Sequence, residues 1–201
     1  MLDDRQPIVN LVGERVALGP PERAQMVNYQ RWFNDFQTMR TQGEPGPAPQ
    51  TAEGMAPWYD GHMSGQADIA WFSVYELATW RHIGFTELKD IDWVNRRAEL
   101  TLMVGELDCR GRGYGTEMVR LTLDYGFTAL GLHSIMLTLA EYNVAGRRAY
   151  ERAGFREFGR RREAWRLGER LWDEIYMDCL AREFTGSRLA ATFAPDPPRN
   201  R

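Results

Sequence analysis

Cysteine is scarce in this sequence of 201 residues, which has only Cys109 and Cys179. A disulfide framework is therefore not expected, and a reducing cytoplasm is the default location. No apolar run approaches the ~18 residues that span a bilayer, and the acidic N-terminus lacks the apolar stretch of a signal peptide. The histidines His62, His82 and His133 are scattered and have no cysteine or histidine at ligand spacing. No metal site is predicted.

The sequence also has no excess of basic residues. The chain has 25 Lys and Arg against 28 Asp and Glu, a formal net charge of −3, which argues against a nucleic-acid partner. Hydrophobic residues make up 43% and charged residues 26%, and seven Trp, nine Phe and eight Tyr argue against disorder. The length fits one domain with a sizeable core.

The hydrophobic patterns predict a mixed α/β order within one domain. Strands are predicted at 8–18, 68–77, 81–89, 96–104, 134–140, 155–166 and 170–180. Helices are predicted at 22–34, 51–64, 116–130 and 143–153. A segment rich in glycine and proline, residues 41–51, is predicted to be a loop.

The most informative segment is Arg110-Gly111-Arg112-Gly113-Tyr114-Gly115-Thr116, which lies between a predicted strand and a long buried helix. Its glycines allow a tight turn and a close approach to a ligand. The first amides of the following helix are free and carry partial positive charge, so they favour an anion such as a pyrophosphate. A purely structural turn is the alternative interpretation.

Two other phosphate motifs can be compared directly with this loop. A P-loop would require a Gly-Lys-Ser/Thr end, which is absent. The dinucleotide fingerprint G-x-G-x-x-G is not matched either, because the third glycine comes too early and Thr116 follows it. Glu141, at the end of the next strand, could imitate the ribose-binding acid of that fingerprint. A nucleotide-dependent oxidoreductase therefore stays open as a disfavoured alternative.

A second informative segment runs from Asn143 to Phe155. Asn143 has the chemistry of a helix N-cap, and helical geometry places Asn143, Arg147 and Tyr150 on one side. A phenol there could face a ligand in the crevice beyond the preceding strand. Ordinary packing of Tyr150 on the core is the competing interpretation.

Together these segments resemble the GNAT acetyltransferases, especially the branch of ribosomal-protein N-terminal acetyltransferases and bacterial spermidine/spermine N-acetyltransferases. The signature Q/R-x-x-G-x-G/A is matched from Arg110 to Gly115, and the element Asn…Tyr-Glu-x-x-Gly-Phe is matched from Asn143 to Phe155. The likeness covers residues 11–184. One departure is the segment Gly105 to Cys109, which is one residue longer than usual in the polyamine branch and lacks its common proline.

The resemblance implies the GNAT fold, an α/β (α+β) single domain. Its mixed, mostly antiparallel twisted sheet would have about seven strands flanked by about four helices. The domain would cover residues 1–186, and residues 187–201 would form a mobile tail. Exposed strand edges are compatible with a homodimer.

The resemblance also implies acetyl-CoA as co-substrate, without a metal, and direct transfer of the acetyl group to an amine. The backbone at Met103 and Val104 would pair with the pantetheine amides, and the amides from Arg110 to Thr116 would hold the pyrophosphate. Asn143 would bind the pantetheine arm, and Tyr150 would lie beside the thioester sulfur as general acid. The basic residues Arg147, Arg148 and Arg152 are candidates for contact with the 3′-phosphate.

Glu99 is the candidate receiver of the amine proton, because it lies on the strand that would border the pantetheine. The competing interpretation is a solvated carboxylate paired with Arg96 or Arg97. A tyrosine has an ordinary pKa of ~10 and a thiol ~8.5, so complete proton transfer from Tyr150 would be uphill by about 2 kcal/mol.

The acceptor amine is much less determined by the sequence. Acidic and aromatic residues that could form a cleft for a cation are Glu44, Glu53, Trp58, Tyr59, Asp60, Asp90, Asp92 and Trp93. Solvated loop charges explain them equally well. A polyamine, an aminoglycoside-like molecule and a protein N-terminus stay open as acceptors. A non-catalytic domain that binds acyl-CoA as a regulator is the alternative to an enzyme.

Overall fold

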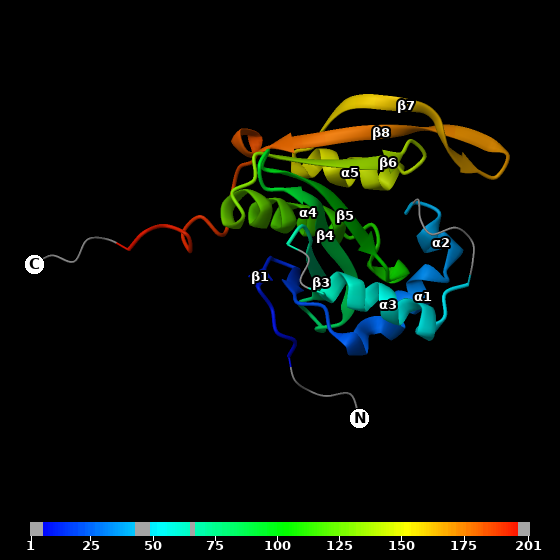
Figure 1. Ribbon diagram of the computed structural model, residues 1–201, viewed down its shortest axis with the longest axis horizontal. Helices are drawn as coiled ribbons and strands as arrows, with labels where there is room; N and C mark the ends of the chain where they lie inside the picture. The colour runs from blue at the N-terminus through cyan, green and yellow to red at the C-terminus, as the bar shows by residue number, and fades with distance from the viewer. Residues whose placement is uncertain (1–5, 43–48, 65–66, 197–201) are drawn as a thin grey trace, which may run out of the picture.

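The computed structural model describes residues 6–42, 49–64 and 67–196, which fold around one sheet (Figure 1). The strands are β1 Leu11–Val12, β2 Val16–Gly19, β3 Ala70–Glu76, β4 His82–Asp92, β5 Arg97–Val104, β6 Ser134–Ala140, β7 Arg156–Leu167 and β8 Arg170–Leu180. The α-helices are α1 Met26–Phe33, α2 Phe36–Met39, α3 Ala52–Met63, α4 Tyr114–Asp124 and α5 Val144–Ala153. Short 3-10 turns cover Arg23–Gln25, Leu107–Cys109 and Ala181–Glu183, and a π-helical turn at Tyr125–Ala129 extends α4.

The strand order is β1-β2-β3-β4-β5-β6-β8-β7, and every pair is antiparallel except β5 with β6. The predicted mixed, mostly antiparallel sheet is confirmed, with eight strands in place of about seven. The extra strand arises because the predicted strand at 8–18 is a hairpin. The amide of Gly13 donates to the carbonyl of Val16 (2.8 Å) and closes the turn between β1 and β2.

The short helix α2 was not predicted from the sequence and brings the number of α-helices in the described residues to five. Its N-cap is Asp35, whose carboxylate accepts hydrogen bonds from the amides of Gln37 (3.2 Å) and Thr38 (3.1 Å). This is ordinary N-cap chemistry. A four-residue helix has too short a hydrophobic pattern to be read from periodicity.

Helices cover both faces of the sheet. On one face, α1 and α3 pack on an aromatic cluster that includes Tyr29, Trp32, Trp71 and Phe85. On the other face, α4 and α5 pack on the aliphatic side chains of β4, β5, β6 and β8. The β7–β8 hairpin lies along the top of the view in Figure 1 and extends beyond the neighbouring strands. No helix in the described part of the chain is long and apolar enough to cross a membrane.

The two central strands β5 and β6 are paired over only three residues each. Their ladder joins Arg97 to Ser134 at one end and Glu99 to Met136 at the other. β5 stays paired with β4 as far as Val104, and β6 stays paired with β8 through its last residue. The two strands therefore separate beyond Glu99 and Met136, and each has an edge that faces the opening.

Asp124, the last residue of α4, is buried and holds the C-terminal segment against the domain. Its carboxylate accepts hydrogen bonds from the amides of Arg188 (2.6 Å) and Leu189 (3.1 Å) and from the hydroxyls of Thr128 and Ser187. The predicted mobile tail begins at residue 187, so its first three residues are fixed by this carboxylate. The mobility of the remaining residues stays a prediction.

Replacement of Asp124 by Ala is expected to lower the free energy of unfolding by about 3 kcal/mol, because buried donors lose their acceptor. Denaturant unfolding followed by tryptophan fluorescence measures this change. The control is Asp60→Ala, which removes an exposed carboxylate paired with Arg23 and should cost less than about 1 kcal/mol. Equal, small losses in both variants would contradict a stabilising role for Asp124.

Candidate active site

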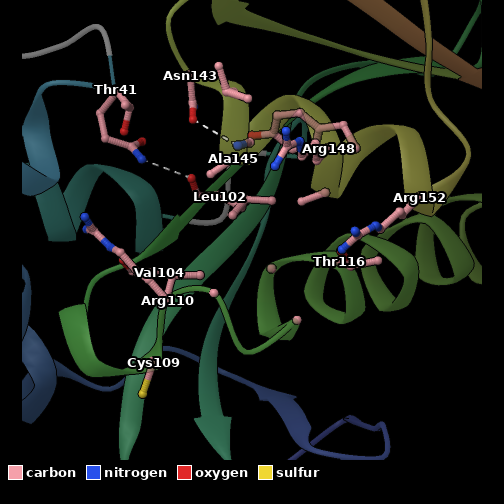
Figure 2. Close-up of a pocket in the computed structure, with 18 of the residues that line it drawn as sticks. Thr41, Leu102, Val104, Cys109, Arg110, Thr116, Asn143, Ala145, Arg148 and Arg152 are labelled. Atoms are coloured by element: carbon pink, nitrogen blue, oxygen red, sulfur yellow. Dashed lines mark hydrogen bonds between the residues drawn. The ribbon is translucent and has the colours of Figure 1, made fainter.

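A cavity of about 770 Å³ lies where β5 and β6 separate (Figure 2). Four segments contribute to its wall: residues 37–42 at α2, Leu102 and Val104 on β5, the loop from Cys109 to Thr116, and residues 142–152 at α5. A cavity of that volume lies within the usual size range of cofactor-binding sites. The two motifs singled out in the sequence therefore meet in one place.

The glycine loop forms the cavity wall at the start of α4. Gly111 and Gly113 have φ angles of +73° and +83°, in the left-handed region that glycine adopts without strain. After this turn α4 begins at Tyr114. The first amides of the helix have no partner within the helix, and Gly115 and Thr116 of this first turn line the cavity. The arrangement suits an anion with several oxygens.

Two residues of the loop anchor it rather than line the cavity. The buried hydroxyl of Tyr114 donates a hydrogen bond to Oε1 of Glu76 on β3 (2.6 Å). The carbonyl of Arg112 accepts a hydrogen bond from Nη1 of Arg15 (2.7 Å), and Arg15 also pairs with Glu117. These contacts hold the loop against the N-terminal strands, which explains how a glycine-rich turn keeps one shape.

The cavity is electropositive. Among the described residues its wall contains no aspartate or glutamate and four arginines, namely Arg40, Arg110, Arg148 and Arg152. Arg147, also expected at the cofactor, forms ion pairs with Glu151 (2.9 Å) and Glu157 (3.0 Å) and does not line the cavity. Residues four apart share a helix face, so Arg148 and Arg152 both face the cavity, whereas Arg147 lies on another face of α5.

The edge of β5 presents main-chain groups to the cavity at alternate residues. The carbonyl of Leu102 accepts a hydrogen bond from Nε2 of Gln42 (3.3 Å), and the carbonyl of Val104 accepts one from Nε of Arg110 (3.0 Å). Met103 lies between them, with its side chain in the aromatic cluster and its carbonyl oxygen against Gly84 on β4. The groups available for strand-like pairing therefore belong to Leu102 and Val104, since a strand alternates its sides.

Asn143 and Tyr150 both line the cavity from α5. Asn143 is the N-cap, as predicted, and its Oδ1 accepts a hydrogen bond from the amide of Gly146 (3.0 Å). Tyr150 packs edge-to-face on Phe155 with ring centroids 6.0 Å apart and is only 9% exposed. No described residue hydrogen-bonds its hydroxyl, and burial raises the pKa of Tyr150 to about 12. The phenol is therefore protonated near neutral pH.

Glu99 lies outside the cavity wall, at the last position of β5 that pairs with β6. Its carboxylate forms a cross-strand ion pair with Nζ of Lys89 (3.2 Å). The two arginines considered as partners are engaged elsewhere, Arg97 with Asp92 (3.2 Å) and Arg96 with the carbonyl of Gly131 (2.6 Å). Its role as proton acceptor stays a prediction.

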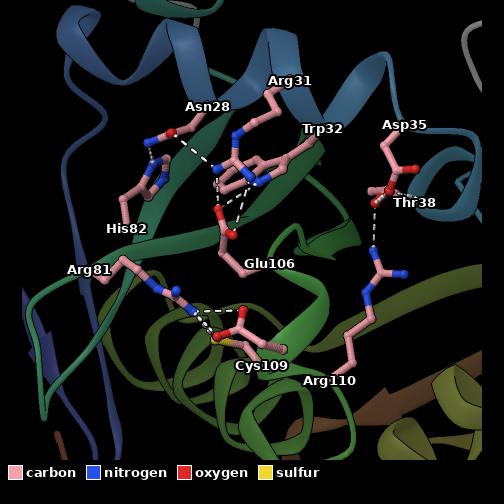
Figure 3. Close-up of polar contacts among 11 residues, drawn as sticks. Asn28, Arg31, Trp32, Asp35, Thr38, Arg81, His82, Glu106, Cys109 and Arg110 are labelled. Carbon is pink, nitrogen blue, oxygen red and sulfur yellow. Dashed lines mark hydrogen bonds and ion pairs between the residues drawn. The ribbon is translucent and has the colours of Figure 1, made fainter.

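The α2 segment is the part of the site that sequence analysis missed. Nη2 of Arg110 donates to the hydroxyl of Thr38 (2.9 Å), next to Asp35, as Figure 3 shows. The hydroxyl of Tyr142 donates to the carbonyl of Arg40 (2.6 Å). α2 thus forms a wall joined to both sides of the opening. The capping carboxylate of Asp35 was the only local signal for it.

The proposed acidic and aromatic cleft is not assembled as one surface. Tyr59 is buried with its hydroxyl on the carbonyl of Pro21 (3.2 Å), whereas Asp60 and Trp93 are exposed. Trp58 and Tyr59 both join the aromatic cluster under α3. Glu44 lies outside the described residues. Across the described part of the chain, no group of three or more possible metal ligands comes together.

Comparison with known proteins is consistent with this geometry. A family profile described as "Acetyltransferase (GNAT) domain" matches residues 15–156. Spermidine N(1)-acetyltransferase of Vibrio cholerae is 32% identical over 126 residues, which are 63% of this chain and 71% of that protein. Spermidine N(1)-acetyltransferase of Escherichia coli K12 is 30% identical over 140 residues, 70% of this chain and 72% of that protein.

Among solved structures, the crystal structure of spermidine N-acetyltransferase from Vibrio cholerae in complex with CoA and spermine matches with a TM-score of 0.77 at 26% identity. The match covers 85% of this chain and 98% of that one. The expected fold is confirmed. The matched profile covers well over half of the chain, which therefore belongs to the GNAT family and is an N-acetyltransferase that takes its acetyl group from acetyl-CoA.

Proposed function

We propose that this enzyme acetylates a primary amine of a diamine or polyamine, with acetyl-CoA bound where β5 and β6 separate. The observation that carries the proposal is the cationic cavity, which combines free helix amides, two strand-edge carbonyls and a buried phenol. The relatives that act on spermidine support this acceptor class. A protein N-terminus is the second candidate acceptor.

Each part of the cofactor has a matching surface. The pyrophosphate would bind the amides between Gly111 and Thr116, where the turn meets α4. The pantetheine amides would pair with the edge of β5 at Leu102 and Val104, as an added strand does. In that position they would compete with the side chains of Gln42 and Arg110 for the two carbonyls. The side-chain amide of Asn143 lies at the same wall and would bind the pantetheine arm.

Tyr150 would assist departure of the thiolate. With a pKa of about 12 against ~8.5 for a typical thiol, complete proton transfer is uphill by roughly 5 kcal/mol. The pKa difference between Tyr150 and the thiol is larger than it would be for an ordinary tyrosine. It favours a hydrogen bond donated to the developing thiolate over early proton transfer. The proton would move only as the product leaves. A non-catalytic acyl-CoA-binding domain would have no use for such an unpartnered phenol at the cavity.

Glu99 would receive the proton of the incoming amine through water, since its carboxylate lies on the α1–α3 face beside the opening. A neutral amine is needed for attack, and a lysine-like amine with pKa ~10.4 is mostly protonated at neutral pH. The ion pair with Lys89 fixes the carboxylate at the point where the strands begin to diverge. Full kcat in a Glu99→Gln variant would exclude this role.

The location and assembly of the chain are further parts of the proposal. Cys109 and Cys179 are both free and buried, which supports a cytoplasmic enzyme. β7 is an edge strand on which the large apolar side chain of Phe158 is exposed, which supports a homodimer. A molecular mass equal to that of a single chain, measured by light scattering, would exclude the dimer.

The proposed reaction predicts release of free CoA thiol from acetyl-CoA in the presence of spermidine. A thiol-reactive chromophore measures the rate, and mass spectrometry of the product should show one added acetyl group. A peptide with a free N-terminus serves as the competing acceptor. Faster acetylation of the peptide than of spermidine would make protein N-termini the preferred acceptor. If neither acceptor caused thiol release, the proposal would be contradicted.

Replacement of Tyr150 by Phe is expected to lower kcat by about a hundredfold or more, because the leaving thiolate loses its hydrogen-bond donor. The KM for acetyl-CoA should change little, since the ring and its packing are retained. The control is Tyr125→Phe, which removes a hydroxyl from a half-buried tyrosine outside the cavity wall. Unchanged kcat in the Tyr150 variant would remove its role as acid.

Arg148→Ala and Arg152→Ala are expected to raise the KM for acetyl-CoA roughly tenfold or more, because each removes a charge-assisted contact with phosphate. The KM for acetyl-dephospho-CoA, which lacks the 3′-phosphate, should change much less if that group is the partner. Arg147→Ala is the matched control from the same helix and should affect neither KM. Equal effects on both cofactors would assign the two arginines to the pyrophosphate.

A further inference from the structure

The side chain of Glu87 on β4 is buried on the α1–α3 face of the sheet, outside the cofactor cavity. It is only 8% exposed, and no described residue donates a hydrogen bond to its carboxylate. Its nearest charge partner is His62 of α3, with Nε2 at 3.9 Å from Oε2. That distance is longer than a hydrogen bond. A buried carboxylate without a donor is costly and calls for an explanation.

The tautomer of His62 is determined by its other nitrogen. Nδ1 lies 2.8 Å from the carbonyl oxygen of Trp58. Since a carbonyl can only accept, Nδ1 carries the hydrogen, and Nε2 of the neutral ring is then an acceptor. The carboxylate of Glu87 and Nε2 of His62 therefore face each other as two acceptors 3.9 Å apart, both able to receive a hydrogen bond from one shared donor.

The surroundings favour a cation as that donor. The rings of Trp58 and Trp71 have their centroids 4.6 Å and 5.2 Å from the ring of His62. Aromatic faces attract ammonium groups, and an ammonium has three N–H donors and no acceptor. Burial raises the pKa of Glu87, against the smaller opposing effects of His62 and Lys89, so the charged form of this buried carboxylate is incompletely stabilised. An ammonium hydrogen-bonded to both acceptors would supply it.

The position of Glu87 relates this pair to the reaction. Glu87 is directly opposite Thr101 on β5, and Thr101 precedes Leu102 of the cofactor cavity. Neighbouring strands are ~4.8 Å apart, so an ammonium at Glu87 would lie about one strand from the opening between β5 and β6. Glu99 is on the same face of β5, two residues from Thr101. A spacer of a few methylenes would connect the two places.

We propose that Glu87 and His62 bind the second, non-reacting ammonium group of the acceptor, and that this pair selects diamines and polyamines over monoamines and protein N-termini. The inference rests on the proposed acetyl transfer. The acceptor would lie across β4 and β5 under α3, with its remote ammonium at Glu87 and its neutral amine at the strand opening. Specificity would come from a buried acceptor pair that only a second cation satisfies.

The test compares 1,4-diaminobutane with n-butylamine, which has the same carbon chain but one nitrogen. In the wild type kcat/KM for the diamine should exceed that for the monoamine by at least tenfold. Glu87→Gln should raise the KM for the diamine roughly tenfold or more and leave the monoamine within about threefold. His62→Phe, which keeps a ring under Trp58, should reduce the same selectivity. Asp68→Asn is the control, because Asp68 is an exposed carboxylate outside the proposed acceptor site.

Unfolding temperature and calorimetric CoA affinity establish that each variant is folded and retains its cofactor site. Loss of selectivity with both properties unchanged supports the proposal. Selectivity that persists in Glu87→Gln, or a wild type that does not prefer the diamine, overturns it. Equal loss of activity with both amines also overturns it, because it assigns Glu87 a general role. Failure of the wild type to acetylate any amine contradicts the proposed function itself.

Discussion

The candidate active site depends on the early end of one strand ladder. β5 and β6 share three residue pairs and then diverge, while β4 and β8 continue to hold their other edges. Only the row of hydrogen bonds between β5 and β6 is given up, so each strand keeps its other neighbour. The main-chain groups released by the divergence still need partners. Gln42 and Arg110 supply them at Leu102 and Val104, which are the positions where a strand-like ligand would pair.

The walls on either side of the opening are tied to one another. Glu106, just beyond β5, accepts hydrogen bonds from Arg31 and from the indole of Trp32 (3.0 Å), as Figure 3 shows. A Cβ on Gly105 would lie 2.1 Å from the ring of Trp32, so α1 packs directly on the main chain there. Arg110 completes the connection through Thr38. The glycine loop and the helices over the acceptor side therefore form one unit.

The sheet also separates charge. The cavity where β5 and β6 separate is lined by four arginines and, within the described residues, by no carboxylate. The α1–α3 face carries Glu87, and Glu99 in its ion pair with Lys89, near the same opening. An anionic cofactor and a cationic acceptor would thus approach from surfaces of opposite charge, and the transfer would take place between them. Direct transfer needs such an arrangement, because both substrates must be bound together.

Local chemistry in the sequence determined the glycine turn, the N-cap at Asn143, the strand at 134–140 and both helices that border the cavity, since each depends on residues close in the chain. Most of the fold follows from the same hydrophobic patterns. Tertiary structure alone decided which side chains face the cavity. It placed Leu102 rather than Met103 at the free edge, and it gave Glu99 a lysine partner from the adjacent strand. Those outcomes depend on strand register and on contacts between segments far apart in sequence, which no local pattern encodes.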